Sequence, residues 1–290
     1  MSHALFFSSS SKSGLAHKIQ IFSERCSGSN FIESVLTTNH TGAEITWEYG
    51  WKHFFPEKEV KSDPGLNVVV LARSPFRWLR SVYRQPWHVA PRLNGLSFSD
   101  FIRQEWECVR NKDSSIKKTD PSWNTEMLFE RHPKTGERFR NVLEMRIVKH
   151  QEWLKLSHLN PNFISVSYEE IAKSPKHLLQ KICQITGEDL PEKLVIPDSY
   201  KGSTQHGKQF LHRFTGGVLG NHRNKPRLPI TLEDIEFIAS SLDADLERTF
   251  GYDLEALKKE EVSFWKQEVE KEQNLSRPRK FSNFYREAVH

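Results

Sequence analysis

Two short polar segments of this chain combine residue types that bind anions. The first contains a guanidinium, a glycine and several hydrogen-bond donors, namely Arg25, Cys26, Ser27, Gly28, Ser29 and Asn30. An apolar segment, 18–23, precedes it, and apolar residues with helical spacing follow it. A loop between a strand and a helix presents free backbone N–H groups and the positive end of the helix dipole. The segment therefore predicts a phosphate site, although a serine-rich turn capped by Ser29 is an alternative.

The second segment begins at Arg73, directly after the apolar run 66–72. Such a run is typical of a parallel strand that is buried on both faces, and Ser74 and Pro75 are typical of the start of a helix. Ser81 follows Arg73 by eight residues, which places Arg73 at the start of this helix and Ser81 on its flank. Both side chains could contact one phosphate, and each taken singly is equally consistent with a surface position.

A third strand-and-helix unit follows at 162–186. Residues 162–168 have the composition of a strand, Ser174 and Pro175 open a helix, and Gly187 has the residue type that commonly ends one. Strands that alternate with helices predict an α/β fold, with a mainly parallel sheet between two layers of helices. The strand-to-helix loops then lie along one edge of the sheet, where ligands bind.

The pattern divides the chain into a domain with two extensions. Residues 1–17 are serine-rich and contain no arginine, which predicts a mobile tail rather than a targeting segment. Residues 18–254 are expected to form a single domain. Within it, 86–152 is rich in aromatic and basic residues and shows no clear strands, which predicts a helical insertion over the ligand edge, on the acceptor side. Residues 255–290 are highly charged and predict a helix followed by a loosely held tail.

The composition narrows the class of protein. With 37% hydrophobic residues the 290-residue chain can bury a core, and no apolar run reaches the roughly 20 residues of a membrane span. Cys26, Cys108 and Cys183 show no metal-ligand spacing and cannot form a disulfide framework, so a reducing, cytoplasmic location is expected. The net charge of +5 suits an anionic ligand but is too small to indicate nucleic acid as a partner without a concentrated basic patch.

The first polar segment resembles the 5′-phosphosulfate loop of the sulfotransferases that use 3′-phosphoadenosine 5′-phosphosulfate (PAPS), and the matching residues run from Ile21 to Phe31. The second is similar to the family's 3′-phosphate motif, an Arg-Asn/Asp-Pro sequence followed by a serine eight residues after the arginine. The two motifs occur in the family's order, and the resemblance covers 18–83. It implies the P-loop-like sulfotransferase fold and transfer of a sulfuryl group from PAPS to a hydroxyl or amine. It further implies release of 3′-phosphoadenosine 5′-phosphate (PAP) and no metal.

The resemblance also extends to the later part of the chain. Tyr168, in a Tyr-Glu-Glu-Ile segment, would lie near the adenine, or would instead cap the edge of the sheet. The basic, glycine-rich segment 213–224 would close over the 3′-phosphate. The residues expected to bind the donor are Arg25, Cys26, Ser27, Gly28, Ser29, Asn30, Arg73, Ser81, Tyr168 and either Arg213 or Arg223.

A lysine and a histidine lie between the two motifs, where the family has such a pair. The resemblance makes His53 the general base that removes the proton of the acceptor, and makes Lys52 a cation that steadies the sulfate or the leaving phosphate. Cys26 stands where the family usually has a loop lysine, so Arg25 or Lys52 would meet the leaving oxygen. Cys26 at a helix start could also have a lowered pKa, but the spacing gives it no histidine partner.

Two other functions are compatible with this pattern. A magnesium-dependent kinase of nucleosides or other small molecules would use a related sheet, but the chain lacks the G-x-x-x-x-G-K-[ST] loop. A nucleotide-binding protein without turnover would account for the missing loop lysine.

The acceptor is expected to be a small molecule, a saccharide or a peptide. The basic and aromatic residues of 86–152 suit an acidic or sugar-like acceptor, and a solvated basic face explains them as well. Glu144, Arg146 and Lys149 are spaced to meet along a helix, either as a surface ion network or as acceptor contacts. The basic and aromatic residues concerned are Arg92, Trp106, Trp123, Arg131, His132, Arg138 and Arg140.

Overall fold

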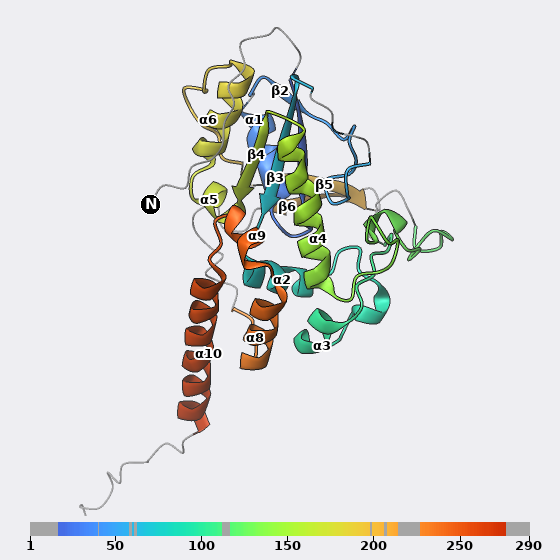
Figure 1. Cartoon of the computed structure of the whole chain (residues 1–290), viewed down its shortest axis with the longest axis vertical. Coiled ribbons are helices and arrows are strands. Elements are labelled where there is room, and N and C mark those ends of the chain that lie inside the picture. Colours follow the sequence, from blue (N-terminus) through green and yellow to red (C-terminus); the bar gives the residue numbers. More distant parts are fainter. Residues whose placement is uncertain are drawn as a thin grey trace, which may run out of the picture.

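A sheet of four parallel strands organises the fold (Figure 1). The computed structural model describes residues 17–39, 41–57, 60, 63–111, 117–197, 199–205, 208–213 and 227–276, with the backbone alone for 199–205, 208–213 and 272–276. The strand order is β2-β1-β3-β4, and all seven residues of β3 are buried, as expected for a strand covered on both faces. The predicted α/β fold with a parallel sheet is confirmed. The strands are β1 (His17–Ser23), β2 (Ala43–Ile45), β3 (Leu66–Ala72) and β4 (Phe163–Ser167).

Helices cover both faces of this sheet. Successive strand residues point to opposite faces, and Leu71 packs in a cluster with Ile32 and Ile182 of the helices on one face. Val70 packs with Trp153 on the other, so the sheet lies between two helical layers. The first layer contains α1 (Ser29–Thr38), α5 (Tyr168–Lys173) and α6 (Pro175–Thr186), and the second contains α4 (Val142–Leu154) and η3 (Lys155–His158).

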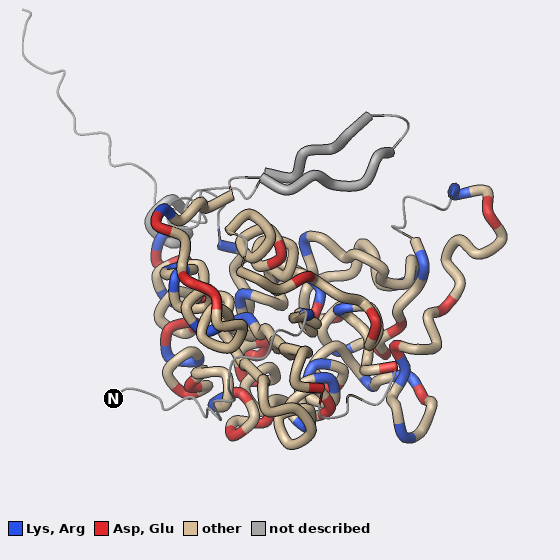
Figure 2. The backbone as a smooth tube through the Cα atoms, turned by 90° about the horizontal axis from the view of Figure 1, so that it is seen from above, with Lys and Arg blue, Asp and Glu red and all other residues tan. Residues whose placement is uncertain are grey.

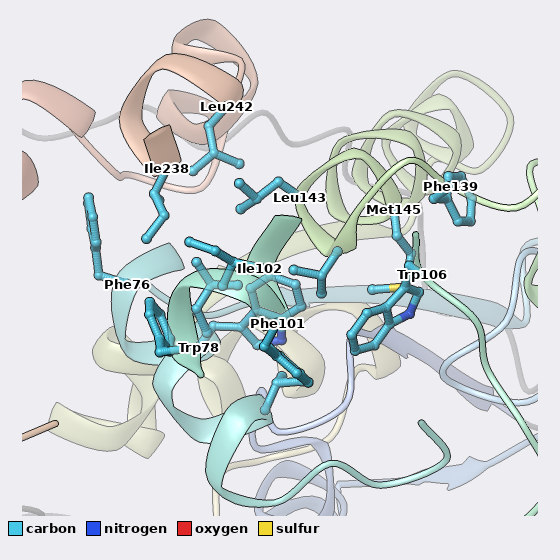
Figure 3. Packing of buried hydrophobic residues seen from close by; sticks show 14 of the residues in the cluster. Phe76, Trp78, Phe101, Ile102, Trp106, Phe139, Leu143, Met145, Ile238 and Leu242 are labelled. Carbon is cyan, nitrogen blue, oxygen red and sulfur yellow. The ribbon is translucent and has the colours of Figure 1, made fainter. Parts of the chain in front are cut away.

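A further group of helices lies beyond the carboxyl ends of the strands (Figure 1). Trp78, Phe101 and Ile238 of this group belong to one buried cluster with Leu143 and Met145 of α4 (Figure 3). The cluster holds these helices next to the strand ends, where both predicted anion-binding segments lie. The group consists of α2 (Pro75–Arg84), η1 (Pro91–Leu93), α3 (Phe98–Arg103), η2 (Leu128–Glu130), α8 (Leu232–Ser241), α9 (Ala244–Thr249) and α10 (Leu254–Ser276).

The segment 86–152 contains less helix than expected. Before α4, its described residues form only α3 and the single-turn helices η1 and η2. Isolated antiparallel bridges, between Val89 and Cys108 and between Trp106 and Phe139, join its loops. Trp106 and Phe139 are buried (Figure 3), so these aromatic side chains stabilise the segment through core packing rather than through a helical face.

Some elements are absent from the sequence predictions. The three-residue β2 is too short to show a pattern, and β5 (Ser199–Gln205) and β6 (Lys208–Arg213) form a separate antiparallel pair. The expected N-terminal tail lies outside the described residues except for His17, and so does the end of the chain from 277. No described helix has the length and apolar character that a membrane crossing requires. Basic and acidic residues are interspersed along the described chain (Figure 2).

Candidate functional site

The two polar segments lie side by side at the carboxyl ends of β1 and β3. Ser23 of β1 pairs with Leu71 of β3, so the loop 24–28 and Arg73 leave the sheet at the same edge. The chain passes from β1 to β2 on one side, whereas β3 lies on the other side of β1. Ligands of open parallel sheets bind where the connections diverge in this way. Arg73 Nη1 donates a hydrogen bond of 2.8 Å to the carbonyl of Cys26, which joins the two segments directly.

Gly28 shapes the first segment. Its φ of +97° lies in the left-handed region, and a Cβ at this position would lie 2.4 Å from the Tyr168 ring, so the backbone requires glycine. Gly28 is the N-cap of α1, and no side chain caps this helix. The expected capping by Ser29 is therefore wrong, because Ser29 is the first helical residue. The first turn of α1 thus offers backbone N–H groups to an anion.

Buried polar atoms at both strand ends have no hydrogen-bond partner within the described chain. They are Ser23 Oγ at the end of β1, and Arg73 Nε and Ser74 Oγ directly after β3. The Ser74 N–H is satisfied, because it donates to the Glu169 carboxylate at 3.3 Å. Buried polar groups in folded proteins are nearly always hydrogen-bonded. These three atoms are therefore candidates for hydrogen bonds to a polar ligand.

Tyr168 and Ser81 border the same edge. Tyr168 is the first residue of α5, and its ring packs against Gly28 with its centroid 5.0 Å from the Arg73 guanidinium. Such a distance permits a cation–π interaction. Ser81, on α2, lies within hydrogen-bonding reach of the Cys26 thiol. Tyr168 and Ser81 therefore both lie next to the hydrogen bond between Arg73 and Cys26.

Cys26 is a neutral thiol in this loop. Burial raises its pKa to about 11, although the neighbouring Arg73 charge acts in the opposite direction. Its Sγ donates to the carbonyl of Gln85 over 3.7 Å. The lowered pKa expected for a cysteine at a helix start is wrong here, because loss of hydration outweighs the nearby positive charge. Cys26 is therefore not a thiolate nucleophile at neutral pH.

His53 contacts Ser23, the last residue of β1. Its side chain is buried, with the residue only 8% exposed, and Nδ1 lies 2.8 Å from the carbonyl oxygen of Ser23. Burial and the positive charges of Arg25 and Lys52 hold its pKa well below the usual 6.5. The neutral ring then donates its Nδ1–H to Ser23, which leaves the Nε2 lone pair to accept a proton.

We expect His53 to titrate well below pH 6.5 and to destabilise the fold in acid. Because the folded state binds this proton less readily than the unfolded chain, stability should fall as pH drops below 6.5. Replacing Lys52 by methionine removes a positive charge, so the pKa of His53 should rise. NMR of ring-labelled histidine measures the pKa of His53 in the wild type and in Lys52→Met. A wild-type His53 pKa at or above 6.5 would contradict the expectation.

Lys52 is positioned at the start of α1. Its Nζ lies 2.7 Å from the Glu33 carboxylate and also donates to Asn30 Oδ1. The Lys52 carbonyl accepts the Ser23 N–H at 2.8 Å, which fixes the lysine beside the end of β1. Its charge therefore lies at the helix turn that follows the loop.

Arg25 is engaged by side chains of other segments. Its guanidinium pairs with Glu130 of η2 and lies 5.1 Å from the centroid of the Trp51 ring. Glu130 pairs at the same time with Lys149, whose Nζ also donates to the carbonyl of His53 at 2.6 Å. Arg25, Glu130 and Lys149 form a buried ion triad, which attaches the loop to the segment 86–152. Both candidate cations for the leaving oxygen are thus paired with carboxylates, Arg25 with Glu130 and Lys52 with Glu33.

Arg146 contacts the chain just after both strands, at Glu24 and at Arg73. The sequence did not predict this contact. Arg146 is fully buried, with Nη1 2.9 Å from Glu24 and Nε 2.6 Å from Glu247. Its Nη2 donates to the carbonyl of Arg73 at 3.0 Å, so one guanidinium braces both segments. Burial alone would raise the pKa of Glu24, but His150 and Arg146 lower it to about 2.

The expectation that Arg146 and Lys149 form a surface ion network with Glu144 is wrong, while acceptor contacts by these residues stay a prediction. Both are buried, and Glu144 pairs instead with Arg140. Their spacing along α4 was the only available signal, and it could not reveal which face of the helix meets the core.

The side chains of the remaining two residues predicted to bind the donor are not among those that the structure describes. The backbone of Arg213 pairs with Ser199 at the end of β6, and Arg223 lies outside the described residues. The described residues contain no cluster of three or more His, Cys, Asp or Glu suited to a metal ion. A comparison with models of known protein families and with curated proteins found no match.

Proposed function

We propose that this protein is a sulfotransferase with the P-loop-like fold of that family, which transfers the sulfuryl group of PAPS to a hydroxyl or amine. The observation that carries the proposal is the hydrogen bond between Arg73 and Cys26. It joins the two segments that resemble the family's donor-binding motifs, at an edge where three buried polar atoms have no hydrogen-bond partner among the described residues.

The residues at this edge suit a nucleotide that carries anionic groups at two ends. A phosphate monoester carries about 1.5 to 2 negative charges at neutral pH, so the donor needs cations or N–H groups at both ends. The first turn of α1 would take the 5′-phosphosulfate, and Arg73 with Ser81 would take the 3′-phosphate. The Tyr168 ring, between these two places, offers a flat surface for the adenine.

His53 and Lys52 supply the chemistry in this proposal. As the acceptor oxygen bonds to sulfur, its proton moves to His53 Nε2, and the bond between sulfur and the bridging phosphate oxygen breaks with its electron pair left on PAP. Lys52 stabilises the charge that develops on that oxygen. Positioning and charge stabilisation by these residues require no metal ion in the proposal.

Replacing Arg73 by alanine is expected to weaken PAP binding by about 10- to 150-fold. A hydrogen bond to a charged group contributes roughly 1.5–3 kcal/mol, and each 1.4 kcal/mol is tenfold in affinity. Isothermal titration with PAP in excess EDTA measures the effect. Arg77→Ala is the matched control, because Arg77 lies on the same helix but its side chain is 54% exposed and pairs with the exposed Glu260 at 3.9 Å. Equal affinity in the two variants would remove Arg73 from the donor site.

Transfer from radiolabelled PAPS to a panel of hydroxyl and amine acceptors tests the activity itself. Transfer in EDTA supports the sulfotransferase. PAP binding without transfer to any acceptor favours a nucleotide-binding protein, which the engagement of Arg25 by Glu130 would also suit. Stabilisation by ATP and magnesium alone favours the kinase.

A further inference from the structure

A groove of about 550 Å³ opens beside the loop, between the end of α2 and loops of the segment 86–152. Gln85 lines this groove, and its carbonyl accepts the hydrogen bond from Cys26 Sγ. One wall of the groove is thus continuous with the proposed donor site.

Aromatic rings lie between the groove and His53, the proposed general base. Trp87 lines the groove, and the ring of the next residue, His88, has its centroid 5.5 Å from that of Trp51. The Trp51 ring in turn lies 4.7 Å from that of His53. The rings of His88 and Trp51 thus link the wall of the groove to His53, and Gln85 links it to the loop.

Asn111, in the wall of this groove, has an unsatisfied acceptor. The residue is only 7% exposed, and its Nδ2 donates to the carbonyl of Val89 at 3.0 Å. Its Oδ1 is buried and has no hydrogen-bond partner within the described chain. Leaving a buried acceptor unpaired is unfavourable, so the site calls for a ligand that donates a hydrogen bond.

The other side chains of the groove indicate which kind of hydrogen-bonding ligand would fit. Trp87 and Trp123 present indole rings, and Asn94 and Asn124 present amides that both donate and accept. A sugar ring has the complementary chemistry, because its C–H face is apolar and its rim carries hydroxyl groups. Ligand sites commonly combine apolar walls with a few convergent polar groups in this way.

The charge of the groove indicates the charge of its ligand. Among the described residues that line it, Arg84 and Lys118 are cations and none is acidic. We infer that the groove binds an anionic saccharide as the acceptor, an inference that rests on the proposed sulfotransferase activity. A sugar hydroxyl would then form the new bond to sulfur and lose its proton to His53.

Direct binding tests this inference without the donor. The probes are a hyaluronan tetrasaccharide, which carries carboxylates, and the neutral chitotetraose, each titrated into the full-length protein and followed by tryptophan fluorescence and calorimetry. We expect Trp123→Ala to weaken the binding of both by about tenfold. Lys118→Gln should weaken only the anionic probe, by about two- to fivefold. Lys155→Gln, a partly exposed lysine on η3, is the charge control and should change neither.

The outcomes separate this inference from the proposed function. Failure of the anionic probe to bind, or binding that is indifferent to Trp123→Ala in a variant with normal thermal melting, overturns the saccharide site even if PAP binds. Binding of an acidic tyrosine peptide in place of the saccharides, with the same sensitivity to both variants, overturns it in favour of a peptide acceptor. Saccharide binding without sulfuryl transfer retains the groove as a saccharide site and rejects the activity.

Discussion

Replacement of His53 by asparagine should lower kcat for sulfuryl transfer by about 10²- to 10⁴-fold, the usual contribution of general acid–base catalysis. The amide Nδ2 of asparagine can still donate to the Ser23 carbonyl, which His53 Nδ1 contacts at 2.8 Å. The variant therefore removes the proton acceptor and keeps the structural hydrogen bond. PAP affinity should stay within about threefold, because loss of a neutral ring changes no charge at the donor site.

Steady-state rates at saturating PAPS, together with the PAP dissociation constant, measure this effect. His158→Asn is the control, since His158 is exposed on η3, and its kcat should match the wild type. Normal turnover in His53→Asn would assign proton removal to another group. A parallel loss of PAP affinity and turnover would instead indicate that His53 supports the loop.

Local sequence patterns predicted the parts of this site that lie next to strand ends. The apolar runs that end at Ser23 and Ala72 mark β1 and β3, and parallel strands bring their carboxyl ends to one edge. Gly28 was predicted for the same reason, because a strand-to-helix turn that admits a ligand needs a residue without Cβ. These inferences use only neighbouring residues and the geometry of a parallel sheet.

Partnerships across the sequence could not be predicted in this way. Arg25 and Glu130 are 105 residues apart, and Arg146 and Glu24 are 122 apart. A basic residue in a polar loop has the same local pattern whether it meets a ligand or a buried carboxylate. Only the packing of the segment 86–152 decides between the two, and before α4 the described residues of that segment form one short helix and two single-turn helices.

The pKa of Cys26 illustrates a related limit. Its place at the start of α1 indicated a lowered pKa, and the Arg73 charge does act in that direction. Burial nevertheless prevails and raises the pKa to about 11. Sequence position identifies nearby charges, whereas the loss of hydration depends on how the loop packs against α2.

Replacement of Glu130 by alanine should destabilise the fold by about 3–5 kcal/mol, because it leaves two buried cations without a counter-charge. The Glu130 and Lys149 side chains are each 1% exposed, and that of Arg25 is 10% exposed. Urea unfolding measures the loss. Glu144→Ala is the control, because Glu144 pairs with the 84% exposed Arg140 and such pairs contribute about 0–1 kcal/mol. A loss below 1 kcal/mol in Glu130→Ala would show that the triad is hydrated.

The same triad should account for part of the acid sensitivity. Burial raises the pKa of Glu130, but the charges of Arg25 and Lys149 prevail and lower it from 4.5 to about 2. A carboxyl whose pKa is depressed on folding stabilises the protein fully above pH 4.5 and loses that contribution as pH falls towards 2. In Glu130→Gln this part of the pH dependence should disappear, while that of Glu24 persists.

Replacing all three members of the triad by methionine tests whether Arg25 also serves the donor. Exchange of a buried ion network for apolar residues is often neutral for stability, so the triple variant should recover most of the stability lost in Glu130→Ala. Because Arg25 faces Glu130 while Lys52 lies at the first turn of α1, PAP affinity should stay within about threefold of the wild type. A folded triple variant that no longer binds PAP would transfer the role of the missing loop lysine from Lys52 to Arg25.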